Sequence, residues 1–254
     1  MSQALPLAGI RVIDYSHFLA GPYVGRCLAA LGAEVIKVER PGSGDAGRQH
    51  AFTLDDQQSG YFLQLNMGKQ GVSVNMKDPR GKAFMQRLTD SADVFIENYR
   101  PGALDKLGLG YAELSARNPR LVYCSISAYG HTGPDAHRAG FGLIAEAKSG
   151  IMQLVGVPGE APPLLRISLG DMYTGIHAVA AINASRADCL FVAGALAATS
   201  SAALADKIVT YTIDPTHSQV RFSWLHVGFS TPGAVFKEVT GTITGLALLN
   251  KAGG

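Results

Sequence analysis

The chain has 254 residues, of which 47% are apolar and 17% are charged, and its formal net charge is +2. This length is enough for a substantial core, in one large domain or in two smaller ones. The small net charge excludes the strongly basic surface typical of nucleic-acid-binding proteins, so no nucleic-acid partner is expected.

The scattered cysteines and histidines indicate neither disulfides nor a metal site. Cys27, Cys124 and Cys189 show neither disulfide nor zinc spacing. His131 and His137 lack a third ligand at metal spacing, so no metal is expected. The start of the chain lacks a basic segment followed by an apolar run, and together these features favour a cytoplasmic protein.

Strand and helix signals alternate along residues 1–184. Short apolar strands are predicted over residues 10–13, 34–38, 72–74, 94–96 and 121–126. Helices are predicted over residues 21–31, 79–88 (capped by Asp78), 111–116, 141–149 and 172–184. This alternation predicts an α/β fold with an open, mostly parallel sheet and helices on both faces. Residues 42–47 match a G-x-G-x-x-G pattern, but no helical pattern follows, so a flexible loop is favoured over a dinucleotide site.

The composition changes after Ala184, which predicts a seam between two unrelated pieces. Residues 189–205 follow Arg186 and end in Ala-Leu-Ala, the design of a secretory signal peptide, although a buried alanine-rich helix is the alternative. Alternating residues at 209–213, 220–224 and 235–243 predict three short antiparallel strands, the last with a bulge at Gly241. The predicted regions are therefore 1–184, 185–205 and 206–254.

Asp171 is the first candidate for a functional side chain. It stands between Gly170 and Gly175, immediately before an apolar helical run. Its carboxylate could cap that helix by accepting from the free amides of the first turn. Alternatively, the glycines would let a substrate carbonyl approach closely, and the carboxylate would attack it.

Cations gather near the predicted carboxyl ends of strands, where open parallel sheets bind ligands. They are Arg40, Lys77, Arg100 and Lys106. Each alone is an ordinary surface charge, but as a set they indicate a phosphate-bearing cofactor.

Five segments together carry a family resemblance: residues 14–22, 31–40, 97–110, 127–134 and 169–175. They resemble the class III CoA-transferase family, the group that contains formyl-CoA transferase, and the resemblance extends over residues 5–184. It implies a Rossmann-like sheet, coenzyme A bound as an acyl-CoA substrate, a small carboxylic acid as acceptor, and Asp171 as the catalytic residue. The family's CoA contacts map onto Leu19, Ala20, Arg40, Val74, Asn75, Met76, Lys77, Asn98, Tyr99, Arg100, Lys106, Ala139, Gly140, Phe141 and Gly142.

Some positions depart from the family pattern. Leu19 stands where formyl-CoA transferase has a glutamine near the acyl group, which leaves the acid specificity open. Asn75 replaces a common aspartate and Lys106 a common arginine. The resemblance stops after Ala184, so about half of a family member is missing. The interlocked homodimer expected of the full-length family needs that half, and the truncated chain could be inactive.

The resemblance implies CoA transfer through a covalent aspartyl intermediate, and two other functions stand as alternatives. The related 2-methylacyl-CoA racemases need a histidine–aspartate pair where this chain has Gly140, Phe141 and Gly142. Residues 186–245 resemble the signal peptide and first strands of a YceI-family protein, an exported barrel that binds polyisoprenoid lipids. The tail thus offers an exported lipid-binding protein as an alternative, which is disfavoured because the signal peptide would be internal and the barrel is incomplete.

Overall fold

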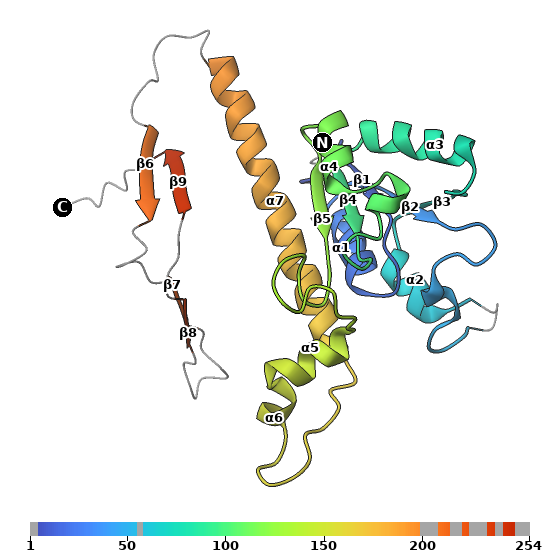
Figure 1. The fold of residues 1–254 in the computed structure, drawn as a ribbon, viewed down its shortest axis with the longest axis vertical. Coiled ribbons are helices and arrows are strands. Elements are labelled where there is room, and N and C mark those ends of the chain that lie inside the picture. Colours follow the sequence, from blue (N-terminus) through green and yellow to red (C-terminus); the bar gives the residue numbers. More distant parts are fainter. Residues whose placement is uncertain are drawn as a thin grey trace. The chain divides into compact units, whose positions relative to one another are not determined.

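The computed structural model describes residues 5–54 and 58–198, followed by strands at 208–213, 220–223, 233–236 and 241–246 (Figure 1). Side-chain positions are described as far as Arg186. The chain divides into two compact units, Met1–Val192 and Ala193–Gly254. The first unit holds every predicted site residue.

A five-stranded, all-parallel sheet forms the centre of the first unit, with the strand order β3-β2-β1-β4-β5. The strands are β1 (Arg11–Asp14), β2 (Glu34–Glu39), β3 (Gln70–Ser73), β4 (Val94–Glu97) and β5 (Val122–Ser125). The five strands predicted from apolar runs are thus confirmed, with ends that shift by at most two residues. Crossovers between parallel strands require intervening helices, as the alternation of signals predicted.

Seven α-helices and two short 3-10 helices belong to the described part of the chain. They are α1 (Ala20–Ala30), α2 (Gly60–Asn66), α3 (Pro79–Asp90), α4 (Tyr111–Arg117), α5 (Gly142–Ser149), α6 (Ile151–Val155), α7 (Leu169–Ala198), η1 (Ala46–Gln49) and η2 (Asp105–Leu107). Asp78 caps α3 as predicted, since its side chain accepts from the amide of Arg80. None of the described helices is long and apolar enough to cross a membrane.

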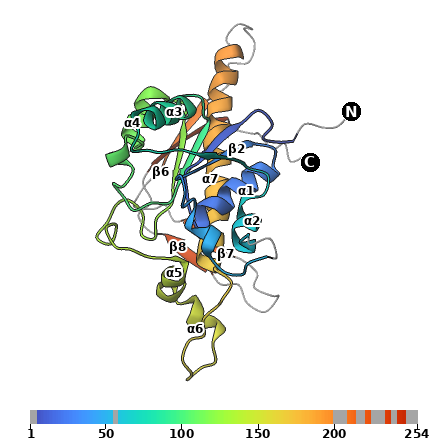
Figure 2. The same cartoon turned by 90° about the vertical axis from the view of Figure 1, so that its right-hand side faces the viewer.

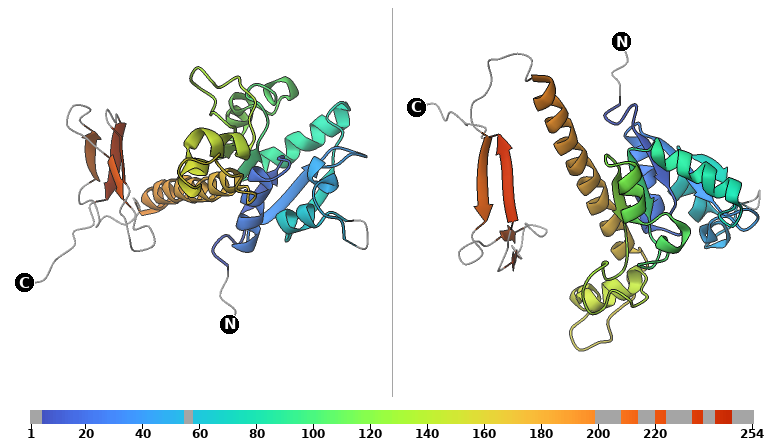
Figure 3. Two further views of the ribbon diagram at one scale, coloured as in Figure 1. Left: turned by 90° about the horizontal axis from the view of Figure 1, so that it is seen from below. Right: turned by 45° about the horizontal axis from the view of Figure 1, so that its top comes forward.

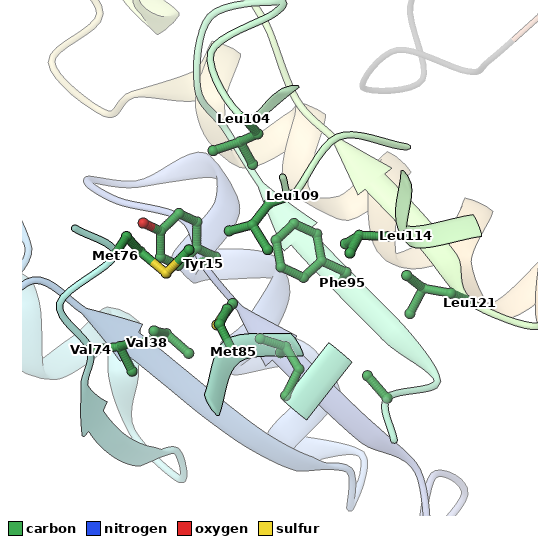
Figure 4. Close-up of a cluster of buried hydrophobic side chains, with 12 residues drawn as sticks. Tyr15, Val38, Val74, Met76, Met85, Phe95, Leu104, Leu109, Leu114 and Leu121 are labelled. Carbon is green, nitrogen blue, oxygen red and sulfur yellow. The ribbon is translucent and has the colours of Figure 1, made fainter. Parts of the chain in front are cut away.

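Helices cover both faces of the sheet, which confirms the predicted fold class (Figure 2). On one face Phe95 of β4 packs against Met85 of α3 and Leu114 of α4 (Figure 4). On the other, Val94 and Ile96 pack with Val24 and Leu28 of α1 and Ile182 of α7. Because successive strand residues point to opposite faces, the run Val94–Glu97 supplies both clusters. Burying each large side chain stabilises the fold by about 1.5–3 kcal/mol.

The structure corrects the prediction in three places. The helix expected to end at Ala184 continues to Ala198, because the sequence from 185 to 198 is rich in alanine and contains no proline. Residues 235–243 are not one bulged strand. They contribute to β8 (Gly233–Phe236) and β9 (Gly241–Leu246), which pair antiparallel with β7 (Val220–Ser223) and β6 (Ile208–Ile213) respectively. The G-x-G-x-x-G segment is no plain loop, since its Asp45 caps η1.

Candidate active site

Asp171 lies in a pocket at the carboxyl edge of the parallel sheet. The loops after β1, β4 and β5 enclose this pocket together with the first turns of α1, α5 and α7. The cavity measures about 140 Å³ and is lined by His17, Phe18, Leu19, Ala20, Asn98, Ile126, Ser127, Ala128, Gly140, Phe141, Gly142, Ala145, Gly170, Asp171 and Thr174. Six of the predicted CoA contacts (Leu19, Ala20, Asn98, Gly140, Phe141 and Gly142) are therefore brought together with the predicted nucleophile.

A network of buried charged side chains lies at the carboxyl ends of β1 and β2, below the pocket. Asp14 is fully buried, and its Oδ2 accepts from the Lys69 Nζ at 2.7 Å. The Nζ of Lys37 lies 3.8 Å from Asp14 Oδ1 and 2.9 Å from Asp45 Oδ2. Burial alone would raise the pKa of Asp14, but the two lysines and its hydrogen bonds outweigh burial and lower that pKa. The network fixes strands β1 and β2 where the pocket loops begin.

The loop after β1 is held by polar side chains from two other segments. Asn98 brackets His17: its Oδ1 accepts from the His17 amide at 2.8 Å, and its Nδ2 donates to the His17 carbonyl at 2.7 Å. The amide of Phe18 donates to Asp45 Oδ1 at 3.0 Å. Phe18 has a φ of 60°, a left-handed conformation that is rare for a bulky residue and is kept by these contacts. Asn98 thus fixes this wall of the pocket through the backbone of His17.

Asp171 is the third residue of α7, so it lies inside the first turn and is not the helix N-cap. Its carboxylate lies beside Gly142, the first residue of α5: a Cβ on Gly142 would come within 2.2 Å of Asp171 Oδ2. Burial and then the neighbouring Glu146 raise the pKa of Asp171, while the Gly142 amide lowers it. The capping hypothesis is therefore wrong, and the carboxylate remains available at the pocket.

The glycines around Asp171 serve helix contacts rather than close approach of a substrate. A Cβ on Gly170 would lie 2.7 Å from the carbonyl oxygen of Gly142. A Cβ on Gly175 would lie 2.7 Å from Cδ1 of Tyr23 in α1. The absence of side chains here lets α7 pack directly against α5 and α1. The expected role of these glycines, to admit a substrate carbonyl, is thus replaced by a packing role.

Several aromatic and acidic residues of the site escaped prediction. The ring of His17 packs against that of Tyr99 at a tilt of 50°, with ring centroids 4.6 Å apart, and burial lowers the pKa of the His17 imidazole. Burial, followed by the charge of Asp171, raises the pKa of Tyr61 in α2. Buried Glu146 in α5 has no sequence signal, being one acidic residue within a short helix. The pairing of Tyr61 and Glu146 with Asp171 depends on tertiary structure, which spacing along the chain does not reveal.

The four predicted phosphate-binding cations are exposed and form no ion pair with another described residue. Arg40 follows β2, and its charge lowers the pKa of Tyr15, His17 and Tyr99, although burial dominates the shift of each. Lys77 follows β3, Arg100 follows β4, and Lys106 lies in η2. These side chains are free to meet anionic groups at the carboxyl edge of the sheet.

The other predicted contacts divide between core and surface. Val74 and Met76 are buried in the core cluster, so only their backbone groups face outward. Asn75 is exposed, and its Oδ1 accepts from the amide of Lys77 at 3.0 Å, which shapes the turn after β3. Ala139 is exposed next to the pocket residue Gly140.

A larger cavity, of about 440 Å³, lies between β5 and α7. Figure 3 shows this long helix from two further directions, with α5 beside its first turns. The described residues lining the larger cavity include Ser125, His177 and Ile182 but no carboxylate. The smaller pocket is the better candidate because it alone holds the half-buried carboxylate.

Fold and site together define an α/β protein with a pocket at the carboxyl edge of its parallel sheet, where open α/β sheets bind ligands, beside a half-buried aspartate. The family model for CoA-transferase family III matches residues 7–188, and the chain belongs to that family. The comparisons do not support the resemblance of residues 186–245 to the YceI family, which stays a prediction.

Curated relatives and a solved structure agree with this family. Succinyl-CoA:glutarate CoA-transferase from Mus musculus is 45% identical over 179 residues, which cover 70% of this chain and 41% of that protein. Acetyl-CoA:oxalate CoA-transferase from Acetobacter aceti is 42% identical over 172 residues, covering 67% and 44%. A CAIB/BAIF family protein from Brucella suis superposes with a TM-score of 0.72 at 39% identity, covering 75% of this chain and 51% of that one. The chain spans less than half the length of these curated relatives.

Proposed function

We propose that the chain carries the CoA-binding half and the nucleophile of a CoA-transferase, an enzyme that moves CoA from an acyl-CoA to a carboxylic acid. The observation that carries this proposal is Asp171, a half-buried carboxylate without an ion-pair partner among the described residues, at the pocket formed by loops after β1, β4 and β5. The substrates named for the relatives are succinyl-CoA with glutarate and acetyl-CoA with oxalate.

The proposed reaction proceeds by nucleophilic catalysis on Asp171. A carboxylate oxygen of Asp171 attacks the thioester carbonyl, the C–S bond breaks, and CoA leaves as a thiolate. The thiolate then attacks the Asp171 carbonyl of the mixed anhydride, which releases the donor acid and leaves an aspartyl-CoA thioester. The acceptor carboxylate attacks this thioester, and the returning thiolate takes the acceptor acyl group. Asp171 ends unchanged, so the cycle consumes no oxidant, water or net proton.

The exposed cations fit the other end of an acyl-CoA molecule. Arg40, Lys77, Arg100 and Lys106 can neutralise its phosphates, and Arg40 can do so in bidentate geometry. The stacked pair Tyr15 and Tyr99 lies near Arg40, with ring centroids 5.6 Å apart. The pocket side chains would hold the thioester near Asp171, since a carboxylate is a weak nucleophile that depends on orientation.

Racemisation fits the pocket less well than transfer. Proton abstraction from an α-carbon requires a base opposite the aspartate. The segment facing Asp171 is Gly140, Phe141 and Gly142, which has no titratable side chain. The homodimer and the cytoplasmic location expected from the resemblance remain predictions.

Intact-mass spectrometry tests the proposed function directly. The purified chain is incubated with succinyl-CoA, and the reaction is quenched with acid, in which the covalent CoA thioester on Asp171 is preserved. We expect the native chain to form the adduct and Asp171→Ala to form none. Excess CoA should raise the melting temperature of both proteins. At a CoA concentration of 100 times its dissociation constant, binding adds about 2.7 kcal/mol to the free energy of unfolding. An equal yield of adduct in Asp171→Ala contradicts the assignment of Asp171 as the nucleophile. A melting temperature that does not change with CoA contradicts the proposed CoA-binding site.

A further inference from the structure

Two helix starts meet face to face at the pocket. Gly142 is the first residue of α5, and Gly170 is the second residue of α7. A Cβ on Gly170 would lie 2.7 Å from the Gly142 carbonyl oxygen, so the two backbones touch without intervening side chains. This contact brings the carboxylates of both helices, Glu146 and Asp171, into one small region.

Each helix start faces a carboxylate from the other helix. Glu146 of α5 accepts a hydrogen bond from the amide of Gly170 at 2.9 Å. Asp171 of α7 lies against Gly142, whose amide favours its ionised form. The first amides of a helix have no partner within the helix, and carboxylates are favoured beside them. The two interactions lock α5 and α7 in one register, with Asp171 at the pocket wall.

Glu146 is an unusual residue for a position this deep. Its side chain is buried, with the residue only 3% exposed, and it makes no ion pair with any described cation. Burying a carboxylate without a counter-charge is costly. The Asp171 carboxylate lies nearby, and after burial the charge of Glu146 is the cause that raises the pKa of Asp171.

We propose that Glu146 is a positioning residue for the nucleophile: it anchors the first turn of α7 and keeps a second negative charge beside Asp171. This inference rests on the proposed function. When Asp171 attacks a thioester, its oxygen forms the new C–O bond, the C–S bond breaks, and the negative charge leaves with the thiolate. The acylated Asp171 is neutral, so its repulsion with Glu146 is relieved in that step.

Other groups near Asp171 do not duplicate this effect. Tyr61 reaches the site from α2, and the charge of Asp171 helps burial to raise the pKa of its phenol, which keeps the phenol neutral. His17 lines the pocket from the β1 loop, and burial lowers the pKa of its imidazole. Among the described groups at this pocket, Glu146 is the one whose negative charge acts on Asp171.

The variant Glu146→Gln separates charge from anchoring. The glutamine oxygen can still accept from the Gly170 amide, so the helix contact is retained and the charge is removed. The titration of the Asp171 carboxyl carbon is followed by ¹³C NMR in the native chain and in the variant, and Asp171→Asn identifies its resonance. We expect the titration midpoint of Asp171 to move to lower pH in Glu146→Gln, with a melting temperature at neutral pH no lower than that of the native chain.

A matched control and a second readout complete the test. Glu113→Gln removes an exposed carboxylate from α4, on the opposite face of the sheet, and should leave the Asp171 midpoint unchanged. Glu146→Gln should also accumulate less CoA adduct than the native chain at equal succinyl-CoA. An Asp171 titration that is the same in Glu146→Gln and in the native chain overturns this inference. Absence of adduct from the native chain, by contrast, overturns the proposed function.

Discussion

At the scale of single residues, the buried charges below the pocket set both stability and geometry. Asp14 links Lys69 and Lys37 while Asp45 pairs with Lys37 from the η1 side. Asp45 also accepts from the amides of Phe18 and Gly47, so it connects the network to the pocket loop. Removing one carboxylate charge from this network leaves a buried lysine without its counter-charge. That lowers the free energy of unfolding, whether or not the intact ion pair is itself stabilising.

We therefore predict that Asp14→Asn destabilises the chain by about 3–5 kcal/mol, the usual cost of breaking a buried pair. Chemical unfolding at pH 7 measures the loss. Because the pKa of Asp14 is lowered in the fold, its contribution exists above the unfolded pKa and fades as pH falls toward the folded value. The difference between the proteins should therefore shrink on acidification.

Asp135→Asn is the matched control for Asp14→Asn. Asp135 also meets two cations, Arg138 and Lys148, but at the surface. Exposed pairs contribute little because water and salt screen them. Equal effects of the two substitutions would mean that burial does not govern the Asp14 network.

At the same scale, the sequence predicted Asp171 as the candidate nucleophile and six residues of its pocket, but not Glu146 and Tyr61. Asp171 and the strand-end cations were found because motif order and strand-end position are properties of the linear sequence. The interpretation of Asp171 as a helix cap was wrong because α7 begins two residues before it, at Leu169. Glu146 and Tyr61 were missed because their role depends on how α5 and α2 pack against α7 and the sheet.

At the scale of elements, glycines decide how closely the helices of the pocket approach. Judged by helix propensity alone, replacing Gly170 with alanine would stabilise α7 by about 1 kcal/mol. The added Cβ would, however, lie 2.7 Å from a backbone oxygen of α5, which has no flexible end that could move aside. Overpacking of this kind costs about 1–3 kcal/mol, so steric overlap should outweigh propensity.

The prediction is that Gly170→Ala lowers the melting temperature and reduces the yield of the Asp171 adduct. Gly71→Ala in β3 is the control, since a Cβ there meets nothing within 4 Å and Gly71 has no positive φ. The calorimetric melt and the mass-spectrometric adduct assay report the two effects. An unchanged melt with a full adduct yield would show that α5 and α7 can separate without loss.

Elements with a clear period and punctuation were the ones predicted correctly. The five strands and α3 carry apolar runs or a cap, as with Asp78. Helix α6 spans only 5 residues, too short for a helical period to appear. Helix α2 was missed although α4, which has the same length of 7 residues, was predicted. The division of residues 233–246 into two strands follows from pairing with β7 and β6, which alternation along one segment cannot reveal.

At the scale of the whole chain, the two core clusters are built within residues 7–182. Helix α7 completes the second of them, the cluster around Val94 and Ile96, where Ile182 is 2% exposed. The family match ends at residue 188, close to the end of the first unit at Val192. The first unit therefore contains the parallel sheet and the described residues that line the pocket with Asp171.

We predict that a chain ending after Ala198 keeps its cooperative melt and its response to CoA. The loss should stay below about 1 kcal/mol, which corresponds to about 2–4 °C for a chain of this size. A chain ending after Arg166 is the control: it lacks Asp171 and the Ile182 contact, so it should fail to melt cooperatively. Thermal scans with and without CoA compare the three lengths. If the chain ending after Ala198 loses its transition, then residues 199–254 complete the fold, and the predicted independence of the tail is wrong.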